Sequence, residues 1–164
     1  MKKLAASGHE IWFCDATFSP RPQDWLPQGI KEFVPSAPLP RDAGPESVEK
    51  GIAEVRRMLE DVKPDVVHAG PVQTAGYGIA LAGFHPMLLM SWGSDILLSD
   101  ERDVKWKEAT RLALEGADGL FVDSTTVLEK ANGRAMLPDD RIVQLPWGVE
   151  LARYERTTAE QDEA

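Results

Sequence analysis

The feature that most constrains the fold is a series of short apolar segments that alternate with segments of helical periodicity. The apolar segments are bounded by glycine, proline or charged residues, which predicts buried strands at residues 11–14, 30–34, 65–69, 87–91, 120–122 and 142–145. Helical patterns occupy residues 47–62, 73–83, 102–115 and 125–131, and residues 1–7 are typical of the end of a helix that stops at Gly8. Because parallel strands need crossover connections, which are usually helices, this alternation predicts an α/β fold with a doubly wound parallel sheet covered on both faces.

Composition limits the class of protein and its partners. The 164 residues are 43% hydrophobic and 27% charged, as expected for one soluble domain. The net charge of −9 argues against nucleic acid as a partner and gives no support for peripheral membrane contact. The sequence shows neither a membrane span nor a signal peptide, and its one cysteine, Cys14, cannot form an internal disulfide, so we expect a cytoplasmic location.

The turn after the strand at residues 65–69 is a candidate ligand site. Ligands of doubly wound sheets bind beyond the carboxyl ends of the strands, where helix N-termini offer free N–H groups. Gly70 allows the backbone to approach a ligand, and Gln73 opens the following helix. His68 at the strand end could contact a sugar hydroxyl. The alternatives are a turn that only connects elements and a histidine that is purely structural.

The segment Ser91-Trp92-Gly93-Ser94-Asp95 follows the next strand and combines an aromatic ring, a hydroxyl and a carboxylate. A tryptophan face packs on the C–H side of a sugar ring, and the polar groups bind its hydroxyls. Asp95 could in addition hold a neighbouring loop. The alternative is that Asp95 only caps a helix or forms an Asx-turn.

Two later turns are weaker candidates. Ser124 follows a strand and opens a helix, so we interpret it first as an N-cap. Gly148 lies in a turn that leads away from the last strand, which suits a linker to a second domain. No metal-ligand spacing, dinucleotide fingerprint, P-loop or nucleophile elbow is present, so we expect no metal and no bound cofactor.

Four segments in this order, at residues 63–68, 91–95, 117–124 and 146–150, resemble the N-terminal domain of family 4 glycosyltransferases, which have the GT-B fold. The resemblance implies a Rossmann-like domain, one of two that face each other across a cleft. It implies retaining transfer from a nucleotide-sugar donor, the co-substrate bound by the other domain, to an acceptor sugar or glycoconjugate bound by this one. On this basis Asp95 is the catalytic candidate, and the substrate-binding candidates are His68, Gly70, Gln73, Trp92, Gly93, Ser94, Ser124 and Gly148.

The sequence departs from the family pattern at several points. Trp92 stands where the family often has a histidine, and Trp147 and Glu150 depart from a usual N-G-V-D-like turn. We expect residues 1–154 to be the acceptor-side domain without its first strand and glycine-rich loop, and residues 155–164 to be an acidic tail or the start of a linker. The absence of a central strand would expose two strand edges or make their neighbours close up, and predicts low stability or self-association.

Other functions remain open at this point. The 164-residue chain alone is expected to be inactive as a transferase, because its partner domain would bind the donor diphosphate. A nucleotide-sugar epimerase of GT-B fold would act on the donor itself, and product analysis separates it from a transferase. A non-catalytic carbohydrate-binding or interaction module would bind without chemistry. The sequence specifies neither the donor, nor the acceptor, nor the oligomeric state.

Overall fold

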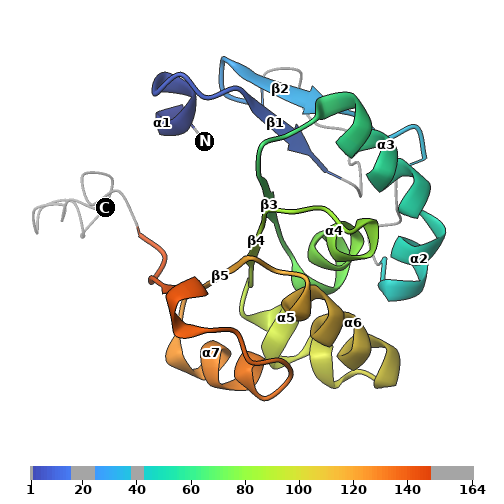
Figure 1. Ribbon diagram of the computed structural model, residues 1–164, viewed down its shortest axis with the longest axis vertical. Helices are drawn as coiled ribbons and strands as arrows, with labels where there is room; N and C mark the ends of the chain where they lie inside the picture. The colour runs from blue at the N-terminus through green and yellow to red at the C-terminus, as the bar shows by residue number, and fades with distance from the viewer. Residues whose placement is uncertain (1, 16–24, 38–42, 149–164) are drawn as a thin grey trace, which may run out of the picture.

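The strands form two sheets, and the strands within each sheet are parallel (Figure 1). The computed structural model describes residues 2–15, 25–37 and 43–148. A two-stranded ribbon contains β1 (Ile11–Cys14) and β2 (Ile30–Phe33), and a four-stranded sheet contains, in spatial order, β3 (Val67–Ala69), β4 (Met87–Met90), β5 (Gly119–Val122) and β6 (Ile142–Gln144). The predicted α/β fold with a parallel, Rossmann-like sheet is confirmed.

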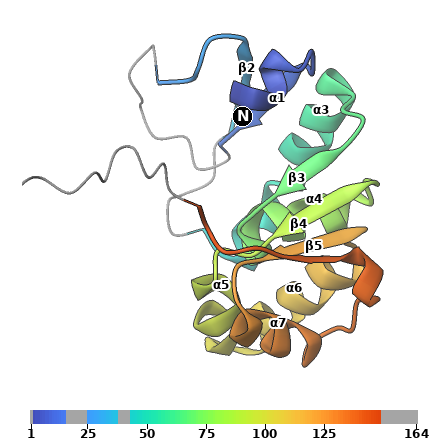
Figure 2. The same cartoon turned by 90° about the vertical axis from the view of Figure 1, so that its left-hand side faces the viewer.

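The described residues also form seven α-helices. They are α1 (Lys2–Ala6), α2 (Pro45–Lys50), α3 (Ile52–Val62), α4 (Tyr77–Ala82), α5 (Ser94–Leu97), α6 (Val104–Glu115) and α7 (Thr125–Asn132). Shorter turns are the π-helical η1 (Val72–Gly76) and the 3₁₀ turns η2 (Ser99–Glu101) and η3 (Asp139–Arg141). In Figures 1 and 2, α5, α6 and α7 lie at the end of the molecule opposite α1 and β2.

Two helical predictions needed correction. The pattern at residues 47–62 forms two helices instead of one, because Gly51 leaves helical geometry at φ −89° and ψ 5° and ends α2. The predicted polar turn at residues 93–95 is the start of α5, whose first residue is Ser94. The predicted stop after the first helix is confirmed, since Gly8 has a φ of 87°, which glycine adopts without strain.

Alternate residues of the four-stranded sheet differ in burial. Met87, Leu89, Leu120 and Val122 are fully buried, and they contribute to the core beneath α4, α6 and α7. Residues of the other face are partly exposed, and Val143 on β6 is 47% exposed. Because side chains alternate along a strand, the buried and the partly exposed residues lie on opposite faces of the sheet. The described helices therefore cover one face closely. The expected cover on both faces is not complete within this part of the chain.

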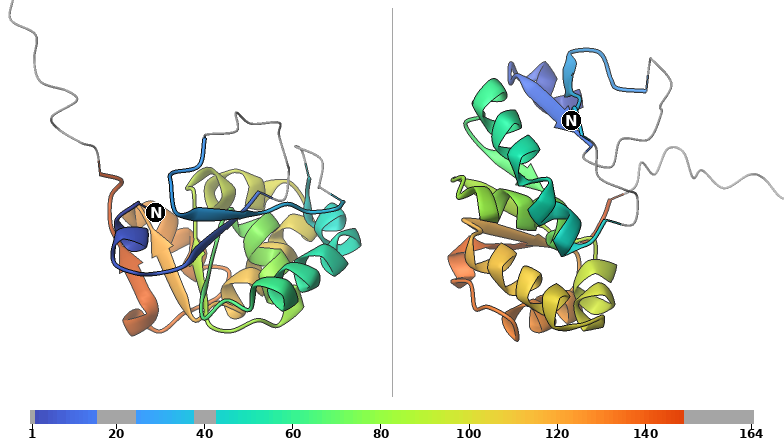
Figure 3. Two further views of the ribbon diagram at one scale, coloured as in Figure 1. Left: turned by 90° about the horizontal axis from the view of Figure 1, so that it is seen from above. Right: turned by 90° about the vertical axis from the view of Figure 1, so that its right-hand side faces the viewer.

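The two sheets are separated between β1 and β3. Among the described residues β1 pairs with β2 and β3 pairs with β4, so each has one unpaired edge. The views of Figures 1 and 3 both place the β1–β2 ribbon apart from the larger sheet. This arrangement matches exposed strand edges, one of the two expected consequences of a missing central strand. Low stability and self-association stay predictions.

No described helix combines the length and the apolar character that a bilayer crossing requires. Cytoplasmic location therefore stays a prediction, as do the domain boundaries, because Val149, Glu150 and the tail lie outside the described residues.

Candidate functional site

Asp95 joins the turns that follow β3 and β4. Its side chain is 4% exposed, and its Oδ2 accepts a hydrogen bond from the Val72 backbone N–H at 3.0 Å. Its Oδ1 accepts from the Ser91 hydroxyl at 2.7 Å and from the Ile96 N–H at 2.9 Å, and the Trp92 N–H lies 3.1 Å from both oxygens. The carboxylate thus holds the neighbouring loop, as one interpretation of the sequence predicted. A direct part of Asp95 in catalysis stays a prediction.

Gln73 connects this carboxylate residue to α6. It is 1% exposed, and its Nε2 donates to the Asp95 carbonyl and to the Thr110 hydroxyl oxygen, both at 2.8 Å. The Thr110 hydroxyl in turn donates to the Trp106 carbonyl at 2.9 Å. These hydrogen bonds connect the two turns to the middle of α6 at Thr110, one helical turn after Trp106.

Trp92 lies against Gly70. A Cβ added at Gly70 would be 2.6 Å from the Met90 carbonyl oxygen and 3.0 Å from the Trp92 Nε1, so the Met90 backbone above all requires glycine here. The Trp92 side chain is 55% exposed. Gly93 is buried and has a φ of 81°, a conformation that glycine adopts without strain. Gly70 therefore allows the Met90 backbone and the Trp92 indole to pack closely on this turn.

A hollow of about 160 Å³ lies at the carboxyl ends of β3 and β4. Its lining consists of Pro71, Gln73, Thr74, Trp92, Ser94, Asp95, Ser99 and Trp106. Four of the predicted site residues, Gln73, Trp92, Ser94 and Asp95, are therefore brought together. The lining combines two tryptophans with hydroxyl groups and contains no lysine or arginine, a combination suited to an uncharged polyhydroxylated ligand.

The other predicted site residues do not line this hollow. His68 on β3 is exposed overall, and the partial desolvation of its ring by neighbouring atoms lowers its pKa, which favours the neutral imidazole. The Ser124 hydroxyl accepts the Val127 N–H at 3.4 Å, which confirms it as the N-cap of α7. Gly148 is exposed. Ligand contacts by these three residues stay predictions.

Trp106 is a site residue that the sequence interpretation missed. It lies in the first turn of α6, where the Asp103 side chain caps the helix by accepting the Trp106 N–H at 3.1 Å. The motif Asp103-x-x-Trp106 is an available signal, because an aspartate N-cap fixes the residue three positions later in the first turn of a helix. The position of that turn beside Gln73 depends on tertiary packing.

Metal binding has no support in the described segments. Within residues 2–15, 25–37 and 43–148, no three or more histidine, cysteine, aspartate or glutamate side chains are grouped so that they could hold a metal ion. The site chemistry of these segments thus consists of aromatic faces, hydroxyls, backbone groups and the Asp95 carboxylate.

The comparison with protein families agrees with this geometry. Residues 29–124, more than half of the chain, match the model of the glycosyl transferase 4-like family. The chain belongs to this glycosyltransferase family, whose substrates are in general sugars or glycoconjugates. No curated protein matches the chain. The matched range includes β2 to β5, all the residues that line the hollow, and Ser124.

Proposed function

We propose that this chain is the acceptor-binding part of a glycosyltransferase that moves a sugar from a nucleotide-sugar donor to an acceptor hydroxyl with retention. The observation that carries the proposal is the hollow at the carboxyl ends of β3 and β4. Its position is where parallel α/β sheets bind ligands. Its volume of about 160 Å³ suits one sugar ring, and the exposed Trp92 provides an aromatic face beside Ser94.

Each site residue has a distinct part in this proposal. Trp92 stacks on the C–H face of the acceptor ring, and Ser94 and Ser99 bind its hydroxyls. Asp95 holds the turn that presents Trp92, since both of its oxygens already accept hydrogen bonds. A positioning part is therefore better supported for Asp95 than proton transfer. His68 lies on β3 outside the hollow, so in this proposal it contacts parts of the acceptor that extend beyond the hollow.

The donor binds elsewhere in this proposal. A nucleotide-sugar diphosphate needs cationic side chains or helix N-termini, and no lysine or arginine lines the hollow. Lys105, on the adjacent turn of α6, lies 2.8 Å from the Glu49 carboxylate, so its charge is already compensated. In this proposal a second domain supplies the cationic groups for the donor diphosphate. This explains why no cation lines the hollow and why the charge of Lys105 is compensated within this domain.

The proposal is tested by measuring saccharide binding to the wild-type chain, to a test variant and to a matched control variant. Trp92→Ala removes the stacking face, and Trp147→Ala removes an equally exposed tryptophan that does not line the hollow. With methyl glycosides of glucose, mannose and N-acetylglucosamine in NMR titrations, we expect Trp92→Ala to weaken binding about 3- to 10-fold. Trp147→Ala should leave binding unchanged. Equal losses in both variants, or no binding by the wild-type chain, would contradict the proposal.

Product analysis separates the enzymatic alternatives. The 164-residue chain is incubated with UDP-glucose or GDP-mannose and a methyl glycoside, and the products are identified by mass spectrometry and NMR. We expect neither a new glycoside nor an altered donor. A glycoside product would refute the need for a second domain, and an epimerised donor would favour the epimerase.

A further inference from the structure

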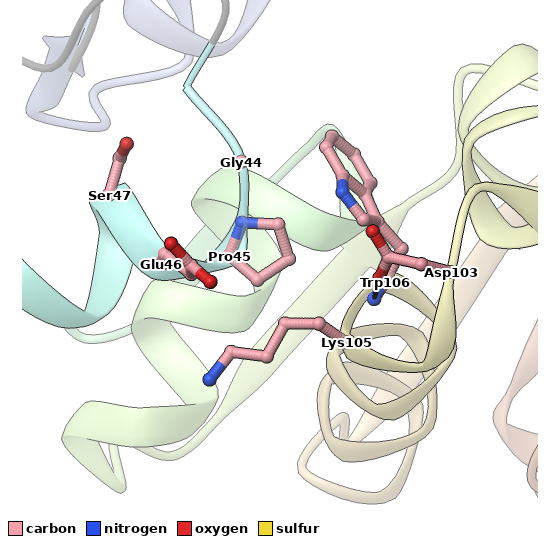
Figure 4. A pocket seen from close by; sticks show the side chains of 7 residues that line it. All are labelled: Gly44, Pro45, Glu46, Ser47, Asp103, Lys105 and Trp106. Carbon is pink, nitrogen blue, oxygen red and sulfur yellow. Dashed lines mark hydrogen bonds between the residues drawn. The ribbon is translucent and has the colours of Figure 1, made fainter.

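A second hollow of about 250 Å³ lies beside the first one and shares the Trp106 side chain with it. Figure 4 shows its lining residues, which come from the start of α2 and the start of α6. On one side are Gly44, Pro45, Glu46 and Ser47, and on the other Asp103, Lys105 and Trp106. Trp106 is therefore a lining residue that the two hollows share.

The position of Trp106 is fixed by contacts of its backbone and of its ring. Its backbone N–H is bound by Asp103, and its carbonyl accepts from Thr110. The Arg102 guanidinium lies 4.5 Å from the ring centroid, a cation–π distance. A Cβ added at Gly44 would be 2.8 Å from the Trp106 Cζ2, so the Gly44 backbone packs directly against the indole. A fixed ring loses little conformational entropy when a ligand binds.

The charges of the second hollow indicate what kind of ligand it accepts. The cation among its lining residues, Lys105, lies 2.8 Å from Glu49, which raises the pKa of Lys105 and compensates its charge. The Arg102 guanidinium does not line the hollow, and it is stacked on the Trp106 ring. The carboxylates of Glu46 and Asp103 are exposed, and the whole chain carries a net charge of −9. These groups accept hydrogen bonds from hydroxyls but repel carboxylates and phosphates.

We propose that the acceptor is an uncharged oligosaccharide, or the glycan of a glycoconjugate, with at least two sugar units that span both hollows across Trp106. One unit occupies the hollow beside Trp92, and the next occupies the hollow at the start of α2. The inference rests on the proposed function and adds the size and charge of its acceptor. Monosaccharides would fill only half of the site, and anionic glycans would be excluded.

The test compares sugars of different length on a variant that blocks only the second hollow. Glu46→Trp places a large ring in that hollow from an exposed position of α2, and Lys50→Trp places the same residue on the exposed end of the same helix as a control. The probes are the methyl glycosides of glucose, mannose and N-acetylglucosamine, their homo-disaccharides and homo-tetrasaccharides, and tetragalacturonate as the anionic probe. Binding is followed by NMR through the indole N–H signals of Trp92 and Trp106.

The expected results distinguish this inference from the proposed function. For at least one sugar series, the disaccharide should bind about 10-fold more tightly than the methyl glycoside. Glu46→Trp should remove this gain without changing methyl glycoside binding, Lys50→Trp should keep it, and tetragalacturonate should not bind. Equal affinity for all lengths, with sensitivity only to Trp92→Ala, would overturn the inference and leave the proposed function intact. Tighter binding of tetragalacturonate than of neutral tetrasaccharides would also overturn it, and no binding of any probe would overturn both.

Discussion

The β1–β2 ribbon and the β3–β6 sheet are both built from short parallel strands, yet they differ in burial. Met87, Leu89 and Leu120 in the larger sheet are 0% exposed. Among the residues of the ribbon, Phe33 alone is buried, at 8% exposed, and Trp12 is 39% exposed. The comparison shows that an apolar segment specifies a strand, whereas the helices packed on it decide whether the strand becomes part of a core.

The contacts that attach the ribbon to α3 are mostly polar. The Ser36 backbone N–H donates to Glu54 Oε2 at 2.9 Å, and the Ser36 hydroxyl donates to the other carboxylate oxygen. The Arg57 guanidinium lies 4.6 Å from the centroid of the Phe33 ring. α3 itself has no fully buried residue. Contacts of this kind at the surface stabilise weakly, so the ribbon should open more easily than the larger sheet.

The largest expected effect comes from emptying the core of the larger sheet. Leu89 is fully buried, and its Cδ1 occupies the space above Gly76. Leu89→Ala should lower the free energy of unfolding by about 3 to 5 kcal/mol, because it removes buried carbons and leaves a cavity. Urea unfolding followed by circular dichroism measures this loss.

The matched variant in the ribbon is Ile11→Ala, at a partly buried position of β1. We expect it to cost less than about 1 kcal/mol, since the exposed part of the side chain gains little from folding. Similar losses for the two variants would show that the ribbon and the sheet share one core, and the comparison would fail.

A smaller loss is expected from removing the buried carboxylate of the site. Asp95→Ala would leave the Val72 and Ile96 N–H groups and the Ser91 hydroxyl without their acceptor, which should cost about 2 to 3 kcal/mol. Saccharide binding should weaken as well, because the Trp92 turn loses its anchor. Both quantities are measured on the same samples by urea unfolding and NMR titration.

The control for Asp95 is an exposed carboxylate of the ribbon. Glu10 accepts from the Trp12 Nε1 at 2.7 Å and lies 3.1 Å from the Lys31 ammonium, but its side chain is 64% exposed. Glu10→Ala should change neither stability nor binding measurably. An unchanged stability of Asp95→Ala would mean that water replaces the lost carboxylate, and the proposed positioning part would then be wrong.

The smallest expected effect is a loosening of the ribbon in acid. Hydrogen bonds from Arg57 and then Ser36 lower the pKa of Glu54 to about 2, from an ordinary value of 4.5. The carboxylate is therefore more acidic in the folded chain, so its stabilising contacts are fully present above pH 4.5 and are lost as the pH falls toward 2. The Ser36 amide signal in NMR should shift with a midpoint near pH 2, and the shift should be absent in Glu54→Gln. A midpoint near 4.5 would show that the contact between Ser36 and Glu54 is not populated in solution.

Much of the fold follows from local sequence pattern. The apolar run at residues 11–14 gives β1 with the predicted bounds, and the predicted strands at 87–91 and 120–122 differ from β4 and β5 by one residue each. The break at Gly51 was missed because the apolar spacing of residues 48 to 62 continues through it. The gap between β1 and β3 concerns the pairing of strands distant in sequence, which local periodicity does not determine.

The candidate site was predicted in part. Strand ends followed by polar turns indicated Gln73, Trp92, Ser94 and Asp95, because the carboxyl ends of parallel strands meet at one edge of a sheet. Trp106 and Ser99 come from segments whose contact with these turns depends on how α6 packs against η1. Only the folded chain shows that Gln73 and Thr110 connect them.

The close packing of the Met90 backbone on Gly70 limits how this site can diverge in related chains. A side chain at position 70 would lie 2.6 Å from the Met90 carbonyl oxygen, a backbone group that every residue at position 90 carries. Across an alignment of homologues, position 70 should therefore stay glycine whatever residue stands at position 92. Relatives with alanine at position 70 should have a different backbone path where β4 ends.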